Sequence, residues 1–338
     1  MEGNRGTVCV TGGTGFIASW LIMRLLEHGY SVRTTVRPDP DDKRDTSFLK
    51  NLPGASERLQ ILTADLSDPE SFSPAIEGCV GVFHVATPVD FEDREPEPVV
   101  TKRSIDGALG ILRACLNSKT VKRVVYTSSA AAIQYNNSGA DILDEDSWSN
   151  VESIREMTRI GASYAISKTL TEKAVLEFGE QHGLEVVTVV PTFVHGPFIC
   201  PKFAGSVRIS LALVLDDLVR AHIFLFKQPD TKGRYICTSA TMTIEEMSKF
   251  LSERYPEFRI PSPESLKELK GPRFPAYRQG NWWTPVLSIS TGSRTCSTEP
   301  SNAAKKRGIS RSTEAYGIQY IRPNVGMFRV PESGHDAV

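Results

Sequence analysis

Short apolar runs rich in β-branched residues alternate with longer amphipathic stretches, and this alternation constrains the fold more than any other feature of the sequence. Six such runs lie at residues 7–11, 31–37, 59–64, 80–86, 122–129 and 185–191. Strands separated by helical patterns predict an α/β fold with a Rossmann-type, doubly wound parallel sheet. The runs are apolar along most of their length, as expected for strands that helices cover on both faces.

The pattern changes after Pro191 and changes again near residue 276. We expect an NADP-binding Rossmann domain over residues 6–191 and a small C-terminal substrate-binding lobe over residues 192–275. In that lobe the sequence predicts a helix opening at LDDLVRAHIFLF, a short strand at GRYICTS and a helix at TIEEMSKFLSERYP. Residues 276–338 are rich in Ser, Thr, Gly, Asn and basic residues without a sustained period, which predicts a disordered tail.

Composition excludes several classes of partner. The 338 residues carry a formal net charge of only -1, so neither nucleic acid nor an anionic membrane surface is expected. No apolar stretch reaches the ~20 residues of a membrane-spanning helix, and the polar start does not fit a signal peptide, so we expect a cytoplasmic protein without membrane insertion. The six cysteines are scattered, which predicts neither disulfides nor a metal site. A monomer and a weak homodimer both fit the apolar residues of 97–117.

A glycine loop follows the first strand directly and opens the first helix. In TGGTGFIASW, Gly12, Gly15 and Ala18 have the spacing GxxGxxA. Glycine lets the backbone turn tightly and approach a pyrophosphate, whose charge is then stabilised by the helix N-terminus. The loop therefore predicts a dinucleotide site, the alternative being a strand-to-helix turn with a structural role alone.

Charged residues after the next two strands indicate which dinucleotide is bound. Arg37 ends the second strand, where an NAD-binding protein would carry an acidic residue, and Lys43 and Arg44 follow. Cations here pair with the 2′-phosphate of NADP, so we predict NADP(H) as cofactor; a solvated basic loop is the alternative. Asp65 and Leu66 follow the third strand and are placed to contact the adenine, although short acidic turns are common.

Three residues fit the chemistry of carbonyl reduction, which needs a proton donor at the carbonyl oxygen and a group that stabilises developing negative charge. Tyr164 and Lys168 lie one helical turn apart in YAISK, so the ammonium group can favour the phenolate and reach the nicotinamide ribose. Ser129 ends the fifth strand, at the sheet edge where open α/β sheets bind ligands. The alternatives are a capping or turn serine and an exposed pair on a helix.

Many segments of the sequence resemble one known family. TGGTGFIAS, TTVR, ADLSDPESF, AIEGCVGVFHVATPVDF, DGALGILRAC, YAISKT and VPTFVHGPF are similar to the plant dihydroflavonol reductase, anthocyanidin reductase and vestitone reductase group. This group belongs to the extended short-chain dehydrogenases, in the NAD-dependent epimerase/dehydratase family. The resemblance covers about residues 6 to 275, and NLPGASE and TKRSIDGALGIL look most similar to vestitone reductases. It implies NADPH-dependent reduction of a flavonoid or isoflavonoid carbonyl in plant cytosol.

The resemblance also implies roles for individual residues. Ser129, Tyr164 and Lys168 would be the catalytic triad, with hydride passing to the carbonyl carbon while Tyr164 donates its proton and Ser129 holds the oxygen. Ser129 and Tyr164 would contact the substrate together with Gln134. The cofactor would be bound by the two catalytic helix residues and by Gly12, Gly15, Phe16, Ile17, Arg37, Asp65, Leu66, Thr87, Thr127, Pro191 and Ser206.

The sequence departs from the family at three places. Gln134 stands where dihydroflavonol reductases carry the Asn that contacts flavonoid ring hydroxyls, which speaks against dihydroflavonol reduction. Leu215 runs directly into Asp216, where the family has additional residues of the substrate pocket. The segment after Tyr277 does not resemble the amphipathic helix with which family members end.

These departures leave other functions open. One is an aromatic aldehyde or ketone reductase of the same family. Another is a nucleotide-sugar epimerase or dehydratase, which would use the same triad but needs room for a diphosphate. The third is a catalytically silent NADP-binding protein, since cofactor residues can persist beside a damaged substrate lobe.

Overall fold

The computed structural model describes residues 5–39, 45–88, 95–139, 142–156, 161–192, 194–195, 199–200, 213–238, 248–249, 252–253, 262 and 276–277. The chain divides into two compact units, Met1–Gly292 and Ser293–Val338, and every described residue belongs to the first. The predicted tail therefore lies outside the described residues except for its first two positions.

The elements follow one another in the alternating order that the sequence predicts. The strands are β1 (Thr7–Thr11), β2 (Ser31–Val36), β3 (Leu59–Thr63), β4 (Gly81–His84), β5 (Arg123–Thr127), β6 (Ile142–Leu143), β7 (Glu185–Pro191), β8 (Val194–His195), β9 (Leu213–Val214), β10 (Gly233–Cys237) and β11 (Ala276–Tyr277). The helices are α1 (Phe16–Glu27), α2 (Ser47–Lys50), α3 (Ala55–Arg58), α4 (Ser73–Ile76), α5 (Glu97–Ser118), α6 (Val151–Glu156), α7 (Ala162–His182) and α9 (Leu215–Lys227), with 3₁₀ turns η1 (Pro69–Phe72) and η2 (Ala130–Ala132).

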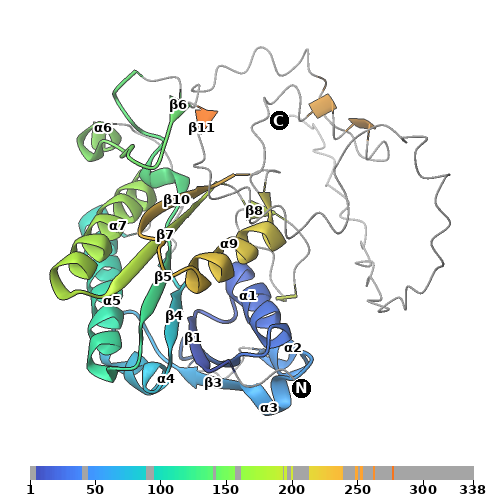
Figure 1. The fold of residues 1–338 in the computed structure, drawn as a ribbon. Coiled ribbons are helices and arrows are strands. Elements are labelled where there is room, and N and C mark those ends of the chain that lie inside the picture. Colours follow the sequence, from blue (N-terminus) through green and yellow to red (C-terminus); the bar gives the residue numbers. More distant parts are fainter. Residues whose placement is uncertain are drawn as a thin grey trace, which may run out of the picture. The chain divides into compact units, whose positions relative to one another are not determined.

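Seven strands form one parallel sheet in the order β10-β7-β5-β4-β1-β2-β3, which confirms the predicted Rossmann fold. In Figure 1, α5 and α7 lie side by side on one face of this sheet, and α1 and α9 cover the other. The chain leaves β1 toward β2 and β3 and then continues on the opposite side with β4. Ligands of such sheets bind at this switch point, beyond the carboxyl ends of the strands.

Alternate residues of each strand supply two separate hydrophobic cores. Val10 and Val125 pack with residues of α1 and α9, whereas Cys9 and Val124 pack with residues of α5 and α7. All four side chains are fully buried. Because successive side chains of a strand point to opposite faces, apolar runs of this kind suit a sheet covered on both sides.

The structure places α9 and β10, which the sequence assigned to a separate lobe after Pro191, with the Rossmann sheet. Strand β10 pairs with β7 from Gly233↔Val187 to Cys237↔Pro191. The sequence did not predict this arrangement, because the regular alternation of strand and helix patterns is interrupted after Pro191. The sheet thus gains its outermost strand from a segment that the sequence assigned to the substrate lobe.

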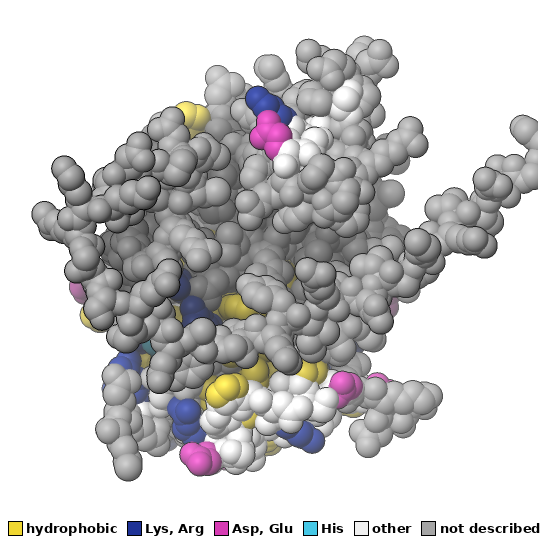
Figure 2. Space-filling model, turned by 90° about the vertical axis from the view of Figure 1, so that its right-hand side faces the viewer, with side chains coloured by type: hydrophobic (Ala, Val, Ile, Leu, Met, Phe, Trp, Pro, Cys, Tyr) yellow, Lys and Arg dark blue, Asp and Glu magenta, His cyan; other side chains and the backbone are white. Residues whose placement is uncertain are grey.

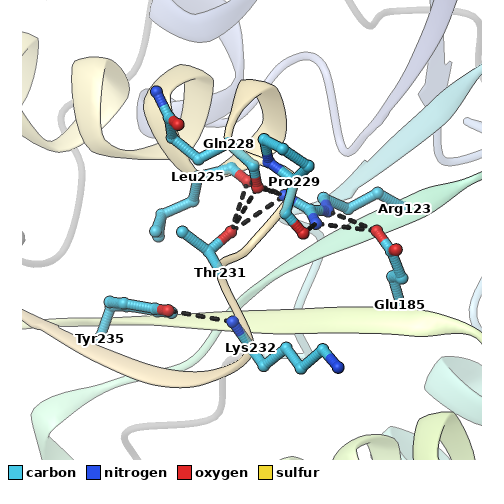
Figure 3. A network of polar contacts seen from close by, with 8 residues as sticks. All are labelled: Arg123, Glu185, Leu225, Gln228, Pro229, Thr231, Lys232 and Tyr235. Atoms are coloured by element: carbon cyan, nitrogen blue, oxygen red, sulfur yellow. Dashed lines mark hydrogen bonds and ion pairs between the residues drawn. The ribbon is translucent and has the colours of Figure 1, made fainter.

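Arg123 holds the end of α9 on this sheet (Figure 3). Its guanidinium group is buried and donates hydrogen bonds to the backbone oxygens of Leu225 (2.8 Å), Pro229 (2.7 Å) and Gln228. Arg123 also pairs with Glu185, its register neighbour on β7, at 2.8 Å. The last carbonyl groups of a helix have no partner within it, so the arginine satisfies groups that would otherwise need water.

Two small parallel pairs lie outside the main sheet. Strand β8 pairs with β9, and α9 begins at Leu215 immediately after β9. Strand β11 pairs with β6, so the first two residues of the expected tail are strand residues. Of the helix predicted at TIEEMSKFLSERYP, residues 248–249 and 252–253 are helical, and the others lie outside the described residues.

The described surface carries charges of both signs. On the face shown in Figure 2, Lys and Arg side chains lie among Asp and Glu side chains and hydrophobic groups. Within the described ranges, no helix combines the length and the apolar character needed to cross a membrane. Nor do the described His, Cys, Asp and Glu side chains form a group of three or more that could hold a metal ion.

Candidate active site

The glycine loop connects β1 to α1 at the switch point of the sheet. Gly12 has a φ of +76°, and a Cβ at this position would lie 3.1 Å from the Ala86 Cα. At Gly13 a Cβ would lie 2.3 Å from the Thr34 Oγ1, so this glycine, which the motif analysis did not single out, is packed even more tightly. The backbone of the loop therefore carries no side chain at these two positions, and close approach of a pyrophosphate requires such a backbone.

The remaining loop residues begin the first helix. Gly15 is the N-cap of α1, and Phe16 and Ile17 are its first two residues. The first N–H groups of a helix have no partner within it and are available to an anion. The Phe16 side chain itself is buried in the core beneath α1 and α9, so its contribution to a cofactor would come from the backbone.

Arg37 and Asp65 lie near each other beyond the ends of β2 and β3. Arg37 is exposed, and its charge acts on the half-buried carboxyl group of Asp65. Partial burial raises the pKa of Asp65, but hydrogen bonds from Ser67 and the charges of Arg37 and Arg103 outweigh it, so the net pKa lies below its usual value. The carboxylate is therefore charged at neutral pH.

Ser129, Tyr164 and Lys168 lie near one another, where β5 ends and α7 begins. The Tyr164 phenol lies close enough to the Ser129 hydroxyl for that group to lower the pKa of the phenol, and both side chains are partly exposed. Lys168 is buried one turn along α7, where its Nζ donates to the Thr87 Oγ1 at 2.7 Å and to the Thr127 backbone oxygen at 2.9 Å. Ser129 also accepts a bond from the Ala131 N–H at 3.2 Å, so it caps η2 as well.

The acidities of the pair differ from the simple expectation that the ammonium group favours the phenolate. Burial raises the pKa of Tyr164, and the Ser129 hydroxyl lowers it in part. Burial lowers the pKa of Lys168 to about 7, while the Glu172 carboxylate pulls it upward. The protein's own groups thus keep Tyr164 protonated at neutral pH, which is the form that donates a proton in reduction.

A small cavity lies beneath Lys168. It brings together three residues that the sequence assigned to the cofactor, namely Leu66, Thr87 and Lys168, with His84 and Tyr126 of the sheet. The Lys168 Nζ is 5.3 Å from the centre of the Tyr126 ring. Burial and the Lys168 charge lower the pKa of His84 to about 3, so its imidazole is neutral.

The structure also gives the positions of other residues that the sequence assigned to the cofactor or the substrate. Thr127 is buried, and its hydroxyl bonds His222 Nε2 at 2.8 Å, so its side chain is directed toward α9 and its carbonyl toward Lys168. Pro191 ends β7 opposite Cys237. Gln134 follows η2, and its N–H donates to the Ala130 oxygen at 2.9 Å. Lys43, Arg44 and Ser206 lie outside the described residues.

A buried polar group that the sequence did not predict lies behind Ser129, Tyr164 and Lys168. Glu172 is fully buried on α7 and pairs with Arg234 of β10 at 3.0 Å. Ser128 and Thr188 also bond its carboxylate, at 2.7 and 2.6 Å. The spacing Lys168 to Glu172, again i to i+4, was the available signal, but the partner on β10 was hidden because that strand had been placed in another domain.

Comparison with known proteins agrees with this geometry. Residues 8–226 match the NAD dependent epimerase/dehydratase family. The chain is 54% identical to vestitone reductase from Medicago sativa over 81% of this chain and 89% of that protein. Dihydroflavonol 4-reductase from Arabidopsis thaliana is 44% identical over 80% and 76% of the two chains. The crystal structure of alfalfa vestitone reductase superposes with a TM-score of 0.74, at 49% identity, over 84% of this chain and 92% of that chain.

The family match and the relatives cover the same part of the molecule as the glycine loop, the parallel sheet and the Ser129–Tyr164–Lys168 group. Reductases are among the relatives at high identity and high coverage of both chains. The chain therefore belongs to the NAD dependent epimerase/dehydratase family, and within it is an oxidoreductase.

Proposed function

We propose that the chain is an NADPH-dependent reductase that transfers a hydride to the carbonyl of a flavonoid- or isoflavonoid-like ketone, of the vestitone or dihydroflavonol class, in plant secondary metabolism. The observation that carries this proposal is the pair of neighbouring hydroxyl groups of Tyr164 and Ser129, with Lys168 buried one turn behind it. Two partly exposed hydroxyl groups that can meet one carbonyl oxygen are what such a reaction needs.

Each residue of the triad has a defined task in this reaction. NADPH, when bound, supplies the hydride. Tyr164 donates its proton to the carbonyl oxygen, and its raised pKa keeps that proton available at neutral pH. Ser129 donates a hydrogen bond to the same oxygen and so stabilises the negative charge that develops on it. Lys168 is held by Thr87 and the Thr127 carbonyl, close to where the nicotinamide ribose is expected.

The preference for NADPH is supported by Arg37. Its exposed guanidinium group lies beyond β2, where a 2′-phosphate would be bound. Lys43 and Arg44 would add to this site. An NAD-preferring protein would carry a carboxylate in place of Arg37.

The substrate class is supported by the relatives named above. The higher identity to vestitone reductase, together with Gln134 on the loop after η2, favours an isoflavonoid ketone over a dihydroflavonol. A smaller aromatic aldehyde or ketone would use the same triad. We also propose a monomer or weak homodimer in the cytoplasm, with a substrate lobe formed from residues beyond Pro191 that do not belong to α9 or β10.

The test is NADPH oxidation by the purified chain with vestitone, dihydroflavonols, flavanones and aromatic aldehydes as substrates. Changing Tyr164→Phe removes the proton donor and lowers kcat/KM by about 10²- to 10⁴-fold. Tyr30→Phe, which alters a buried tyrosine on the α1 face, is the matched control and keeps full activity. Turnover that survives Tyr164→Phe, or NADPH binding without turnover of any carbonyl, contradicts the proposal.

The same assay tests the cofactor. Arg37→Ser removes a charged donor to the 2′-phosphate, and kcat/KM with NADPH falls about tenfold or more while that with NADH changes little. An equal loss with both cofactors would contradict the assignment of Arg37.

A further inference from the structure

A row of polar residues crosses the sheet beneath the catalytic helix. His84, Tyr126, Thr188 and Arg234 are register neighbours on β4, β5, β7 and β10. We call these four residues the polar row. Two positions earlier on three of these strands are Val82, Val124 and Val186, which pack in the hydrophobic core with α5 and α7. The polar row therefore faces the same helices and replaces apolar packing along one line.

Helix α7 meets the polar row through Glu172. Its carboxylate accepts four hydrogen bonds: from the Ser128 Oγ (2.7 Å), the Thr188 Oγ1 (2.6 Å), and the Arg234 Nε and Nη2 (3.0 and 3.2 Å). These donors come from the end of β5, from β7 and from β10. A buried carboxylate with a two-point arginine contact and two hydroxyl donors is held in one orientation.

The position of Glu172 connects this contact to the triad twice. It lies one helical turn beyond Lys168 on the same face of α7. Its donor Ser128 is the residue directly before Ser129. Glu172 therefore belongs to the helix that carries Tyr164 and Lys168, and its carboxylate binds the segment that carries Ser129.

The charged and titratable groups around Lys168 come from two elements besides α7. Glu172 and Tyr164 share its helix, Tyr126 and His84 belong to the polar row, and Arg234 reaches the group only through Glu172. Burial lowers the pKa of Lys168, and Glu172 is the neighbour that raises it. His84 is neutral because burial lowers its pKa, so the carboxylate is the charge that favours the ammonium form.

We propose that Glu172 is a positioning residue of the active site, which fixes Ser129 relative to Tyr164 through Ser128 and favours the ammonium form of Lys168 over the neutral amine. This inference rests on the proposed function for its kinetic consequences and deepens the account of that site. Arg234 and Thr188 hold Glu172 in place and do not reach the reacting atoms.

The experiment compares the wild-type enzyme with a double variant at Glu172 and Arg234, with Ser128→Ala and with a control, Glu185→Gln. Glu172→Gln alone leaves Arg234 buried without its carboxylate and can fail to fold. The double variant Glu172→Gln/Arg234→Met removes both charges and avoids this problem. Ser128→Ala keeps the ion pair but breaks the contact to the Ser129 segment. Glu185→Gln is the matched control. It removes a carboxylate of β7 that pairs with another buried arginine, Arg123 of β5.

Two readouts separate the roles of Glu172. In the double variant the alkaline limb of kcat/KM moves to lower pH. A fall of about one pKa unit from about 7 raises the ratio of kcat/KM at about pH 6 to that at about pH 8 by about fivefold. In Ser128→Ala the limb stays in place, while kcat falls by up to about tenfold and KM for NADPH is unchanged. A double variant with the wild-type profile, or a Ser128→Ala variant with the wild-type kcat, overturns the corresponding half of the proposal.

A measurement without turnover keeps this test independent of the proposed function. In protein labelled with ¹³C at the lysine Cε, the Lys168 resonance is assigned by its loss in Lys168→Met and titrated by NMR. We expect a midpoint near 7 in the wild type and in Glu185→Gln, and a lower midpoint in the double variant. An unchanged midpoint overturns the electrostatic role. If no carbonyl is reduced by the wild type while the midpoint shifts as expected, the proposed function fails and the role of Glu172 stands.

Discussion

Arg123 and Arg234 are both buried on strands of the same sheet, but one faces α9 and the other faces α7, and their partners differ. Arg123 binds backbone carbonyls at the end of α9 and a carboxylate, Glu185, whose side chain is 49% exposed. Arg234 also donates to backbone oxygens, those of Glu145 (2.9 Å) and Ser147, but its carboxylate partner, Glu172, has no exposure at all. Its guanidinium group lies 3.5 Å from the centre of the Trp148 ring. The first arginine completes a helix end, whereas the second neutralises a buried charge.

The difference shows that the exposure of the carboxylate decides how strongly it depends on its arginine. Water can still solvate Glu185 when Arg123 is lost, because half of the side chain is exposed. Water cannot reach Glu172 when Arg234 is lost, so an uncompensated charge would remain in the core. Only the second arrangement lies next to Lys168, because Glu172 is one helical turn away on α7.

The largest effect is expected from Arg234→Met, which keeps much of the packing on Trp148 but leaves the Glu172 carboxylate without its cation. We expect the free energy of unfolding to fall by about 3–5 kcal/mol, measured by chemical denaturation. Adding Glu172→Gln to this variant removes the remaining charge and restores part of the loss. The comparison of the two arginines breaks down if Arg234→Met is no more costly than the same change at Arg123.

A smaller effect is expected from Arg123→Met. This change leaves carbonyl groups at the end of α9 without their donor, although the Thr231 hydroxyl still donates to the oxygens of Leu225 and Gln228. We expect a loss of about 1–3 kcal/mol in the free energy of unfolding. Glu185→Gln, which keeps the arginine on its carbonyls, should cost less than about 1 kcal/mol. A loss in Glu185→Gln equal to that in Arg123→Met would show that the ion pair, and not the carbonyl contacts, holds α9.

The third expected effect is a change of stability with pH that comes from the α7 side of the sheet. Because burial lowers the pKa of Lys168 from 10.5 to about 7, the folded protein resists protonating it. The resulting penalty is fully present below pH 7 and is lost as the pH rises toward 10.5, so this group makes stability rise with pH, by at most about 1.4 kcal/mol per pH unit.

Lys168→Met removes that penalty at every pH. The stability advantage of this variant over the wild type should therefore shrink between pH 7 and about 8.5. This window lies above the usual pKa of histidine and does not extend above the usual pKa of cysteine thiols. Denaturation at several pH values within the window measures it. A difference between the two proteins that stays constant with pH would show that Lys168 keeps an ordinary pKa in the fold.

Local sequence patterns determined the sheet, and they also predicted the glycine loop and the group of Ser129, Tyr164 and Lys168. Each depends on residues close together in the chain: apolar runs with helices between them, Gly12 and Gly15 between a strand and a helix, and Tyr164 and Lys168 one turn apart. Such patterns are set by backbone geometry and by helical or strand periodicity, so they can be recognised without knowing what packs against them.

The tertiary structure alone decided the outermost strand and the charges around Lys168. Strand β10 joins the sheet through pairing with β7, and Arg234 meets Glu172 across 62 positions of the chain. The pKa of Lys168 then follows from burial and from that one carboxylate, not from its spacing to Tyr164. Desolvation and long-range pairing depend on which surfaces meet when the chain folds, and no local period in the sequence records that.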